Sequence, residues 1–297
     1  MTIRKPGTSR LRGNAGRIVL GLALALATPA WLAGCAATDT TASIDNPDPV
    51  DKMFADADAM MSEGEFESAA KKYEDLERAY PFSNDPAKPY ARKSLAMAAY
   101  AYFKAGEYDS AIVSGKRYTT MHAGTEDAAL AQHVIAMSYY EQMQDSQRDQ
   151  SITKNAITEL KTLVRQYPQS KYAEEAANRL RIAEDSLAAS EMNVGRYYLK
   201  KGQHLAAINR FKSVVTEYQT TAHVEEALMR LTEAYMALGI QQEAQAAAAI
   251  LGHNYPSSPW YKDAYALLQS GGLEPRDHAG SAIAQAWNAA VKTVSGG

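Results

Sequence analysis

Histidine and cysteine, the side chains that most often do chemistry in proteins, are few and scattered in this sequence. The six histidines are His122, His133, His204, His223, His253 and His278. None of them forms an HxxxH pair or joins carboxylates in a cluster, as a metal site would require. The chain has no glycine-rich phosphate loop and no G-x-S-x-G turn, and its one cysteine cannot form a disulfide or a cysteine zinc site. We therefore expect no enzymatic activity, no metal and no cofactor.

The one cysteine, Cys35, lies where an export signal would end. Residues 1–34 start with a basic stretch and continue into an apolar run that a proline interrupts. This run is too short for a comfortable membrane span, which needs about 20 residues, and it fits a signal peptide. Leu32-Ala33-Gly34-Cys35 resembles a bacterial lipobox, which implies cleavage before Cys35 and lipidation of its thiol. The alternative is an ordinary signal peptide with an incidental cysteine.

The residues after the cysteine predict a tether. Residues 35–51 are small and polar and contain two prolines, a composition typical of a flexible linker. About 15 extended residues span at most roughly 50 Å. A lipid on Cys35 would therefore hold the following domain next to a membrane. Ala36, where some lipoproteins have Asp, resembles the default sorting to the outer membrane, with the protein facing the periplasm.

The charge of the mature chain argues against nucleic acid. Residues 1–34 carry five of the 31 basic residues and none of the 34 acidic ones, so their removal changes the net charge from −3 to −8. Nucleic-acid-binding domains usually carry a basic surface. We therefore do not expect nucleic acid to be the main partner.

The rest of the chain repeats one helical unit. Four glycines each precede an alanine by five residues: Gly64 and Ala69, Gly106 and Ala111, Gly202 and Ala207, Gly239 and Ala244. Glycine accepts the positive φ of a tight turn, and small residues let two helices cross closely. This spacing is typical of tetratricopeptide (TPR) repeats, in which a core forms only when units stack. We predict an all-α fold, a right-handed superhelical solenoid of about five TPR helix pairs.

The repeat boundaries divide the chain as follows. We expect the array over residues 52–269, with units at about 52–83, 88–124, 127–170, 171–221 and 222–258 and a capping helix at 259–269. The stretch 171–201 reads as one very long helix, or as two with a break that the sequence does not locate. Residues 270–297 are expected to be a mostly disordered tail that could include one short helix, whose Trp287 face would pack either on the array or on a partner.

Two places depart from the repeat pattern. Residues 144–150 form a polar insert between the helices of unit three, and its Asp145, Arg148 and Asp149 suit a solvated turn, a structural clamp or a partner contact equally well. In unit four, Glu191 occupies a position that usually holds a bulky apolar side chain. Since a buried carboxylate is costly without a partner, we predict an arginine beside it, with Arg196 or Arg179 as candidates.

Several motifs together resemble the BamD family, lipoproteins of the outer-membrane β-barrel assembly machine. They are the Tyr-Pro-Phe-Ser that closes unit one, the Tyr-Pro-Gln-Ser-Lys-Tyr-Ala from Tyr167, the segment Glu191–Leu199 with Gly195 and Arg196, and the segment Ala207–Phe211. The resemblance covers about Met53 to Leu268. It implies a periplasmic scaffold whose C-terminal units dock on a BamA-like barrel protein, beside other lipoproteins of the complex. Its N-terminal units would handle unfolded β-barrel substrates, and Glu191, Gly195 and Arg196 would have structural roles.

The resemblance also points to a docking residue. Arg210 matches the family position that pairs with an acidic residue of the barrel protein. If Ala207, Phe211 and Val214 face inward, then Asn209, Arg210 and Ser213 face outward, where a partner could reach them. The alternative for Arg210 is a solvated surface arginine. The alternative for the whole chain is another TPR lipoprotein, one that coordinates cell-envelope or peptidoglycan synthesis or pilots a secretin.

Overall fold

The structure is a computed structural model that describes residues 49–80, 89–278 and 280–295. The predicted signal peptide, Cys35 and nearly all of the predicted tether lie outside the described residues. The described part contains twelve helices and no strand. None of these helices combines the length and the apolar character needed to cross a bilayer.

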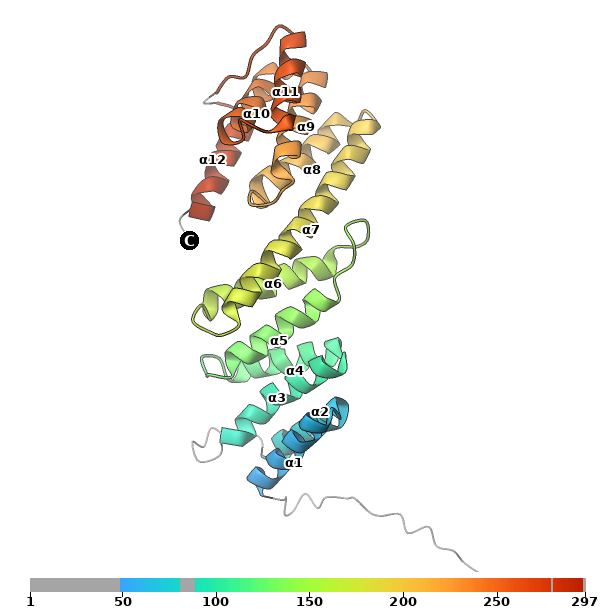
Figure 1. The fold of residues 1–297 in the computed structure, drawn as a ribbon, viewed down its shortest axis with the longest axis vertical. Coiled ribbons are helices and arrows are strands. Elements are labelled where there is room, and N and C mark those ends of the chain that lie inside the picture. Colours follow the sequence, from blue (N-terminus) through green and yellow to red (C-terminus); the bar gives the residue numbers. More distant parts are fainter. Residues whose placement is uncertain (1–48, 81–88, 279, 296–297) are drawn as a thin grey trace, which may run out of the picture. The chain divides into compact units, whose positions relative to one another are not determined.

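Ten of the helices form five consecutive hairpins (Figure 1). The pairs are α1 (Val50–Glu63) with α2 (Phe66–Ala79), α3 (Pro89–Ala105) with α4 (Tyr108–Met121), α5 (Ala128–Glu141) with α6 (Ser151–Gln166), α7 (Ala173–Lys200) with α8 (His204–Glu217), and α9 (Val224–Ala237) with α10 (Gln241–Asn254). α11 (Pro259–Ser270) packs on α9 and α10, and α12 (Ala282–Ser295) follows it. Within α1–α10, each helix packs chiefly on its neighbours in the chain. The predicted all-α, TPR-like array is confirmed.

The repeat glycines close the turns inside the hairpins. Gly64, Gly106, Gly202 and Gly239 have φ of 82°, 79°, 70° and 72°. A side chain at these positions would be strained, because L-residues rarely adopt positive φ. The alanines five residues later are fully buried, and a bulkier residue there would push the two helices apart. The glycine-to-alanine spacing therefore sets both the turn and the close helix crossing.

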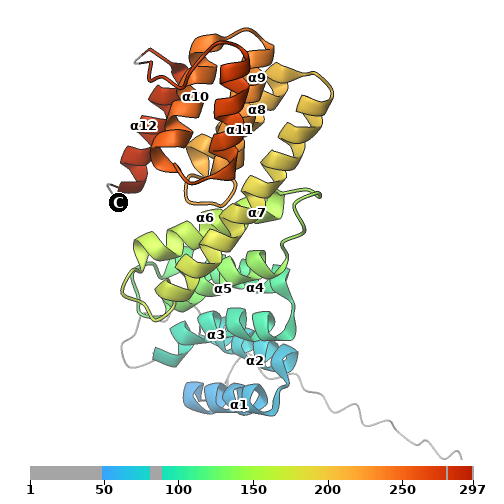
Figure 2. The ribbon, with the colours of Figure 1, turned by 45° about the horizontal axis from the view of Figure 1, so that its top comes forward.

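Helix α7 is one continuous helix of 28 residues, about 42 Å long, so the break that the sequence left open does not occur. Its N-terminal half packs on α6 and its C-terminal half on α8 (Figure 2). The buried core changes at its middle, because Leu187 belongs to the cluster with α6 and Ala188 to the cluster with α8. α7 therefore contributes buried side chains to two successive core clusters.

The C-terminal tail carries the 14-residue helix α12, at the place where the sequence left a short helix open. Ile283 and Trp287 of this helix are buried against α8 and α10, so the Trp287 face packs on the array. The carboxylate of Glu243 on α10 accepts the N–H groups of Ala282 (2.7 Å) and Ile283 (3.0 Å) and the hydroxyl of Ser281 (2.8 Å). The Glu243 carboxylate thus caps the N-terminus of α12, although it belongs to α10.

Candidate docking surface on helices α6, α7 and α8

Paired charges near the middle of α7 form a surface that spans three helices. We call it the joint surface and define it by Lys161 of α6, Glu184 and Glu191 of α7, Arg210 of α8, and Tyr218, which follows α8. Lys161 Nζ lies 2.7 Å from Glu184 Oε1, and Arg210 Nη1 lies 3.1 Å from Glu191 Oε2. Glu184 and Glu191 are seven residues apart, so both lie on the same face of α7.

The predicted arginine beside Glu191 exists, but both named candidates were wrong. Arg210 is the partner, and its Nη1 donates to both carboxylate oxygens of Glu191, at 3.1 and 3.4 Å. Arg196 instead pairs with Glu226, and Arg179 lies near Glu175 and over the ring of Tyr140. Separations of 5 and 12 residues along one helix place Arg196 and Arg179 on other faces than Glu191. The true partner lies on the next helix, 19 residues later.

The residues around Arg210 follow the phase expected for α8. Ala207, Phe211 and Val214 are fully buried, whereas Asn209 and Arg210 are exposed. The Ser213 hydroxyl donates to the Asn209 carbonyl at 3.2 Å, so its donor is used within the helix. Among the described residues, only Nη1 of the Arg210 guanidinium has an acceptor. Its other N–H groups can therefore donate to a partner.

Gly195 allows α7 and α8 to approach closely beneath the joint surface. A Cβ atom at this position would lie 2.5 Å from Cε1 of Phe211, and two more ring carbons would lie within 2.9 Å. Only a residue without a side chain fits against a buried ring at this distance. Glu191 lies one turn before Gly195, and Arg210 directly precedes Phe211. The Gly195–Phe211 contact therefore sets the distance between the backbones that carry Glu191 and Arg210.

Tyr218 lies near the glutamates of both ion pairs. Its side chain packs against both core clusters that meet at α7. Burial raises the pKa of its phenol, and the nearby carboxylates of Glu217, Glu191 and Glu184 raise it further. The phenol therefore stays protonated and neutral at any physiological pH. Sequence analysis missed Lys161, Glu184 and Tyr218, although the spacing of seven residues between Glu184 and Glu191 indicates a shared helix face.

The insert between α5 and α6 folds back on itself. Asp145 Oδ1 accepts the Gln147 N–H at 3.0 Å, and the Asp145 carbonyl accepts the Arg148 N–H at 3.1 Å. Asp149 Oδ1 accepts the N–H of Ser151, the first residue of α6, at 2.9 Å, and these Ser151 hydrogen bonds lower the pKa of Asp149. Two of the three predicted insert residues thus hold the turn by their side chains, and Arg148 does so by its backbone.

A chain of polar contacts connects this insert to α9. Ser146 Oγ accepts from Asn193 Nδ2 at 3.2 Å, and Asn193 Oδ1 accepts from Arg196 Nη1 at 3.0 Å. Arg196 then donates Nε and Nη2 to the two carboxylate oxygens of Glu226, at 3.0 and 3.1 Å. Such a bidentate pair fixes both side chains. The predicted structural residue Arg196 therefore connects α7 to α9, and Asn193 connects it to the insert.

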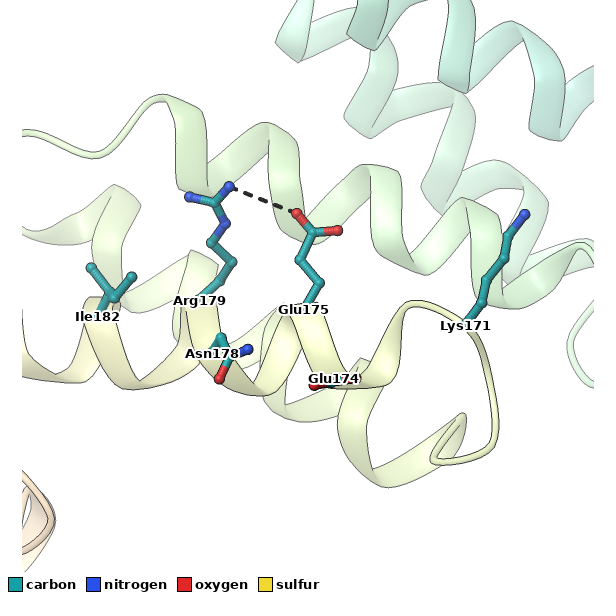
Figure 3. Close-up of a pocket in the computed structure, with 6 residues that line it drawn as sticks. All are labelled: Lys171, Glu174, Glu175, Asn178, Arg179 and Ile182. Carbon is teal, nitrogen blue, oxygen red and sulfur yellow. Dashed lines mark ion pairs between the residues drawn. The ribbon is translucent and has the colours of Figure 1, made fainter.

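An open pocket of about 460 Å³ lies on another part of α7 (Figure 3). Its lining residues are Lys171, Glu174, Glu175, Asn178, Arg179 and Ile182. They come from one helix face and the loop before it, and the charged ones include both signs, with Arg179 and Glu175 paired at 3.7 Å. No three acidic, histidine or cysteine side chains converge on a common point in the part of the chain that the structure describes. The pocket offers no set of groups aimed at one reacting atom.

The fold defines a class of protein, the TPR-like helical solenoids. Residues 46–251 match the family model YfiO, described as an outer membrane lipoprotein. The chain is 37% identical to outer membrane protein assembly factor BamD of Caulobacter vibrioides, over 89% of this chain and 85% of that protein. It is 34% identical to BamD of Rickettsia prowazekii (75% and 86% covered) and 32% identical to BamD of Neisseria meningitidis serogroup A (84% and 95%). The chain belongs to the YfiO/BamD family.

Proposed function

We propose that this protein is a lipid-anchored periplasmic scaffold for the assembly and insertion of outer-membrane β-barrel proteins, and that it docks on a BamA-like barrel protein. The observation that carries the assembly role is the family match, which covers most of the array, together with relatives named as outer membrane protein assembly factors. Other lipoproteins of the same complex and unfolded β-barrel substrates are the further partners that we propose. We propose no catalytic, metal or nucleic-acid role.

We place the docking contact at Arg210, flanked by Asn209 and Ser213. The Arg210 side chain is 44% exposed, and Glu191 pairs only with Nη1, so the Nε–Nη2 edge remains available to a carboxylate of the partner. Arginine suits such a contact, because its planar fork matches a carboxylate in a bidentate arrangement. Glu191 fixes one end of the fork and thereby limits the rotamers that Arg210 must lose when the partner binds.

Charge reversal at Arg210 tests this contact. Arg210→Glu would place a carboxylate beside Glu191 and opposite the partner's acid, so we expect a loss of binding of about 2–5 kcal/mol to the periplasmic domains of the BamA-like protein. Binding would be measured with purified proteins by calorimetry, with circular dichroism to verify the helical content. Lys262→Glu, an exposed lysine on α11, makes the same change in net charge away from the joint surface. Equal affinities for the Arg210 variant and the wild type would refute the docking assignment.

We also propose that Cys35 carries the lipid and that the tether keeps the array at the periplasmic face of the outer membrane. The supporting observations are the lipobox-like Leu32-Ala33-Gly34-Cys35, the residue Ala36 after it, and the family description as an outer membrane lipoprotein. Cys35→Ser should leave the precursor unprocessed or release the protein from membrane fractions. Unchanged processing and unchanged metabolic labelling with a fatty acid would contradict the anchor.

A further inference from the structure

Helix α10 buries a face that the equivalent helices of other units leave to solvent. Seven and eleven residues after the repeat glycine, α8 has Asn209, which is exposed, and Ser213, which is partly exposed. The corresponding residues of α2 and α4 are exposed as well: Lys71, Asp75, Val113 and Arg117. At the same two places α10 has Ala246 and Ile250, whose exposed fractions are only 0% and 6%. They lie on a different face from Ala244, which is at the helix crossing, so α10 is covered on its outer side as well.

Helix α12 provides this cover (Figure 1). It packs on α8 and α10, and its buried apolar side chains follow the spacing i, i+4 and i+7: Ile283, Trp287 and Ala290. By this pattern an amphipathic helix lies in a groove between two other helices. The fully buried Val215 of α8 belongs to the same core cluster as Ile283 and Trp287. Since Val215 is five residues from Arg210, the groove and the joint surface lie on different flanks of α8.

The polar contacts of this groove are made to the backbone of α12. Glu243 accepts the N–H groups of Ala282 and Ile283, and Gln219 Nε2 donates to the Trp287 carbonyl at 3.3 Å. Every helix offers such N–H groups in its first turn, whatever its side chains are. The groove therefore recognises the start of a helix by its polar groups, and selects one helix over another by the apolar side chains.

The segment that joins α12 to the array is irregular. Residues 271–278 form no helix or strand, and Gln245 of α10 holds them. Its Nε2 donates to the Glu274 carbonyl at 2.8 Å, and its own carbonyl accepts the Arg276 N–H at 3.3 Å. α12 has 14 residues, a length at which an isolated helix is marginal in water. Its helical structure therefore depends on the groove, and its few contacts place it among the parts of a fold that open most easily.

We propose that the groove between α8 and α10 is a helix-docking site, that α12 is its occupant, and that α12 docks and releases as one unit. While α12 is released, the groove accepts a free helix of the same pattern. That pattern is an uncapped first turn, a large aliphatic side chain, an aromatic side chain four residues later and a small one three residues after that. Because Gln245 keeps the released α12 close, α12 rebinds at a high effective concentration, and a free helix competes poorly with it.

The test uses a synthetic, fluorescently labelled peptide of residues 280–295, whose binding to the full-length mature protein is measured by anisotropy. Ile283→Ala combined with Trp287→Ala releases α12 and leaves the groove unchanged, and Asn288→Ala, at an exposed position of α12, is the matched control. We expect the releasing variant to bind the peptide at least about tenfold more tightly than the wild type and the control, because its own α12 no longer competes. Glu243→Ala added to the releasing variant should weaken binding of the peptide about tenfold, because the cap is lost.

Three results would overturn the docking site. The peptide could bind the wild type and the releasing variant equally, or bind neither while the unfolding midpoint shows a folded array. Peptide binding that Glu243→Ala leaves unchanged would place the peptide outside the groove.

Hydrogen exchange of the wild type tests the release of α12 without any substitution. The amides of α12 should exchange together and much faster than those of α10, because the array stays folded when α12 leaves it. Equal exchange rates in α12 and α10 would refute release as a unit.

Discussion

Gly195 is the position at which the spacing of α7 and α8 can be tested most directly. Gly195→Ala gains about 1 kcal/mol of helix propensity, because alanine has the best intrinsic preference for a helix interior. Against this gain, the added Cβ would lie 2.5, 2.8 and 2.9 Å from three ring carbons of Phe211, where ordinary contacts start near 3.4 Å. Phe211 is fully buried and cannot turn away without displacing its neighbours.

The size of the effect follows from these two opposing contributions. Overpacking of a core costs about 1–3 kcal/mol, and three simultaneous overlaps place this substitution near the upper end of that range. Subtracting the propensity gain leaves a net destabilisation of about 2 kcal/mol. For a chain of this length that corresponds to a fall of roughly 4 °C in the unfolding midpoint. Because the same contact sets the distance between Glu191 and Arg210, partner binding should weaken as well.

The assay is thermal and urea unfolding of four proteins: wild type, Gly195→Ala, Phe211→Leu and the double variant. Leucine lacks the outer ring atoms, so the double variant should recover part of the loss, with a coupling of about 1 kcal/mol or more. Asn178→Ala, at an exposed position of the same helix, isolates the propensity gain and should leave the stability unchanged or slightly higher. A Gly195→Ala protein as stable as the wild type would refute the close-packing argument.

Two further predictions concern the tail and an acid-sensitive histidine. Glu243→Ala removes the carboxylate that accepts the first N–H groups of α12. We expect α12 to detach, at a cost of about 1–2 kcal/mol, and to show this by a red shift of tryptophan emission and faster proteolysis of the tail. Unchanged emission and proteolysis would contradict this prediction. Burial lowers the pKa of His133, which stacks on Tyr172 at 4.4 Å, although Glu175 opposes that shift. The unfolded chain protonates the His133 imidazole near pH 6.5, whereas the folded chain protonates it only at lower pH. The contribution of His133 to the free energy of unfolding is therefore complete above about pH 6.5 and falls as the pH is lowered. His133→Gln should therefore show a flatter fall in unfolding midpoint between pH 6.5 and 5 than the wild type, and identical slopes would count against it.

The repeating part of the fold could be predicted because its signals are local. Glycine supplies the positive φ of each hairpin turn, and the alanine five residues later marks the helix crossing, so four turns and their contacts follow from spacing alone. The outward phase of Arg210 also follows from the three buried positions around it. These features depend on one helix or one turn, which periodicity describes well.

The features that sequence analysis missed depend on contacts between distant segments. Glu191 finds its arginine on the following helix, and α12 finds its N-terminal cap on Glu243, about 40 positions earlier. Periodicity within one segment cannot identify either partner. The continuity of α7 was left open for a related reason: whether a long helical stretch breaks is decided by what packs on each half, and here α6 and α8 cover successive halves.

The same continuity explains why the joint surface lies where it does. On α7 the core changes from one cluster to the next at Leu187 and Ala188, and this change leaves Glu184 and Glu191 on one face, each beneath a cation of a different helix. A substitution that bends α7 at its middle, such as Ala188→Pro, would break the helix between Glu184 and Glu191 and change the relative position of the two ion pairs. We therefore expect it to weaken partner binding more than loss of Arg210 alone.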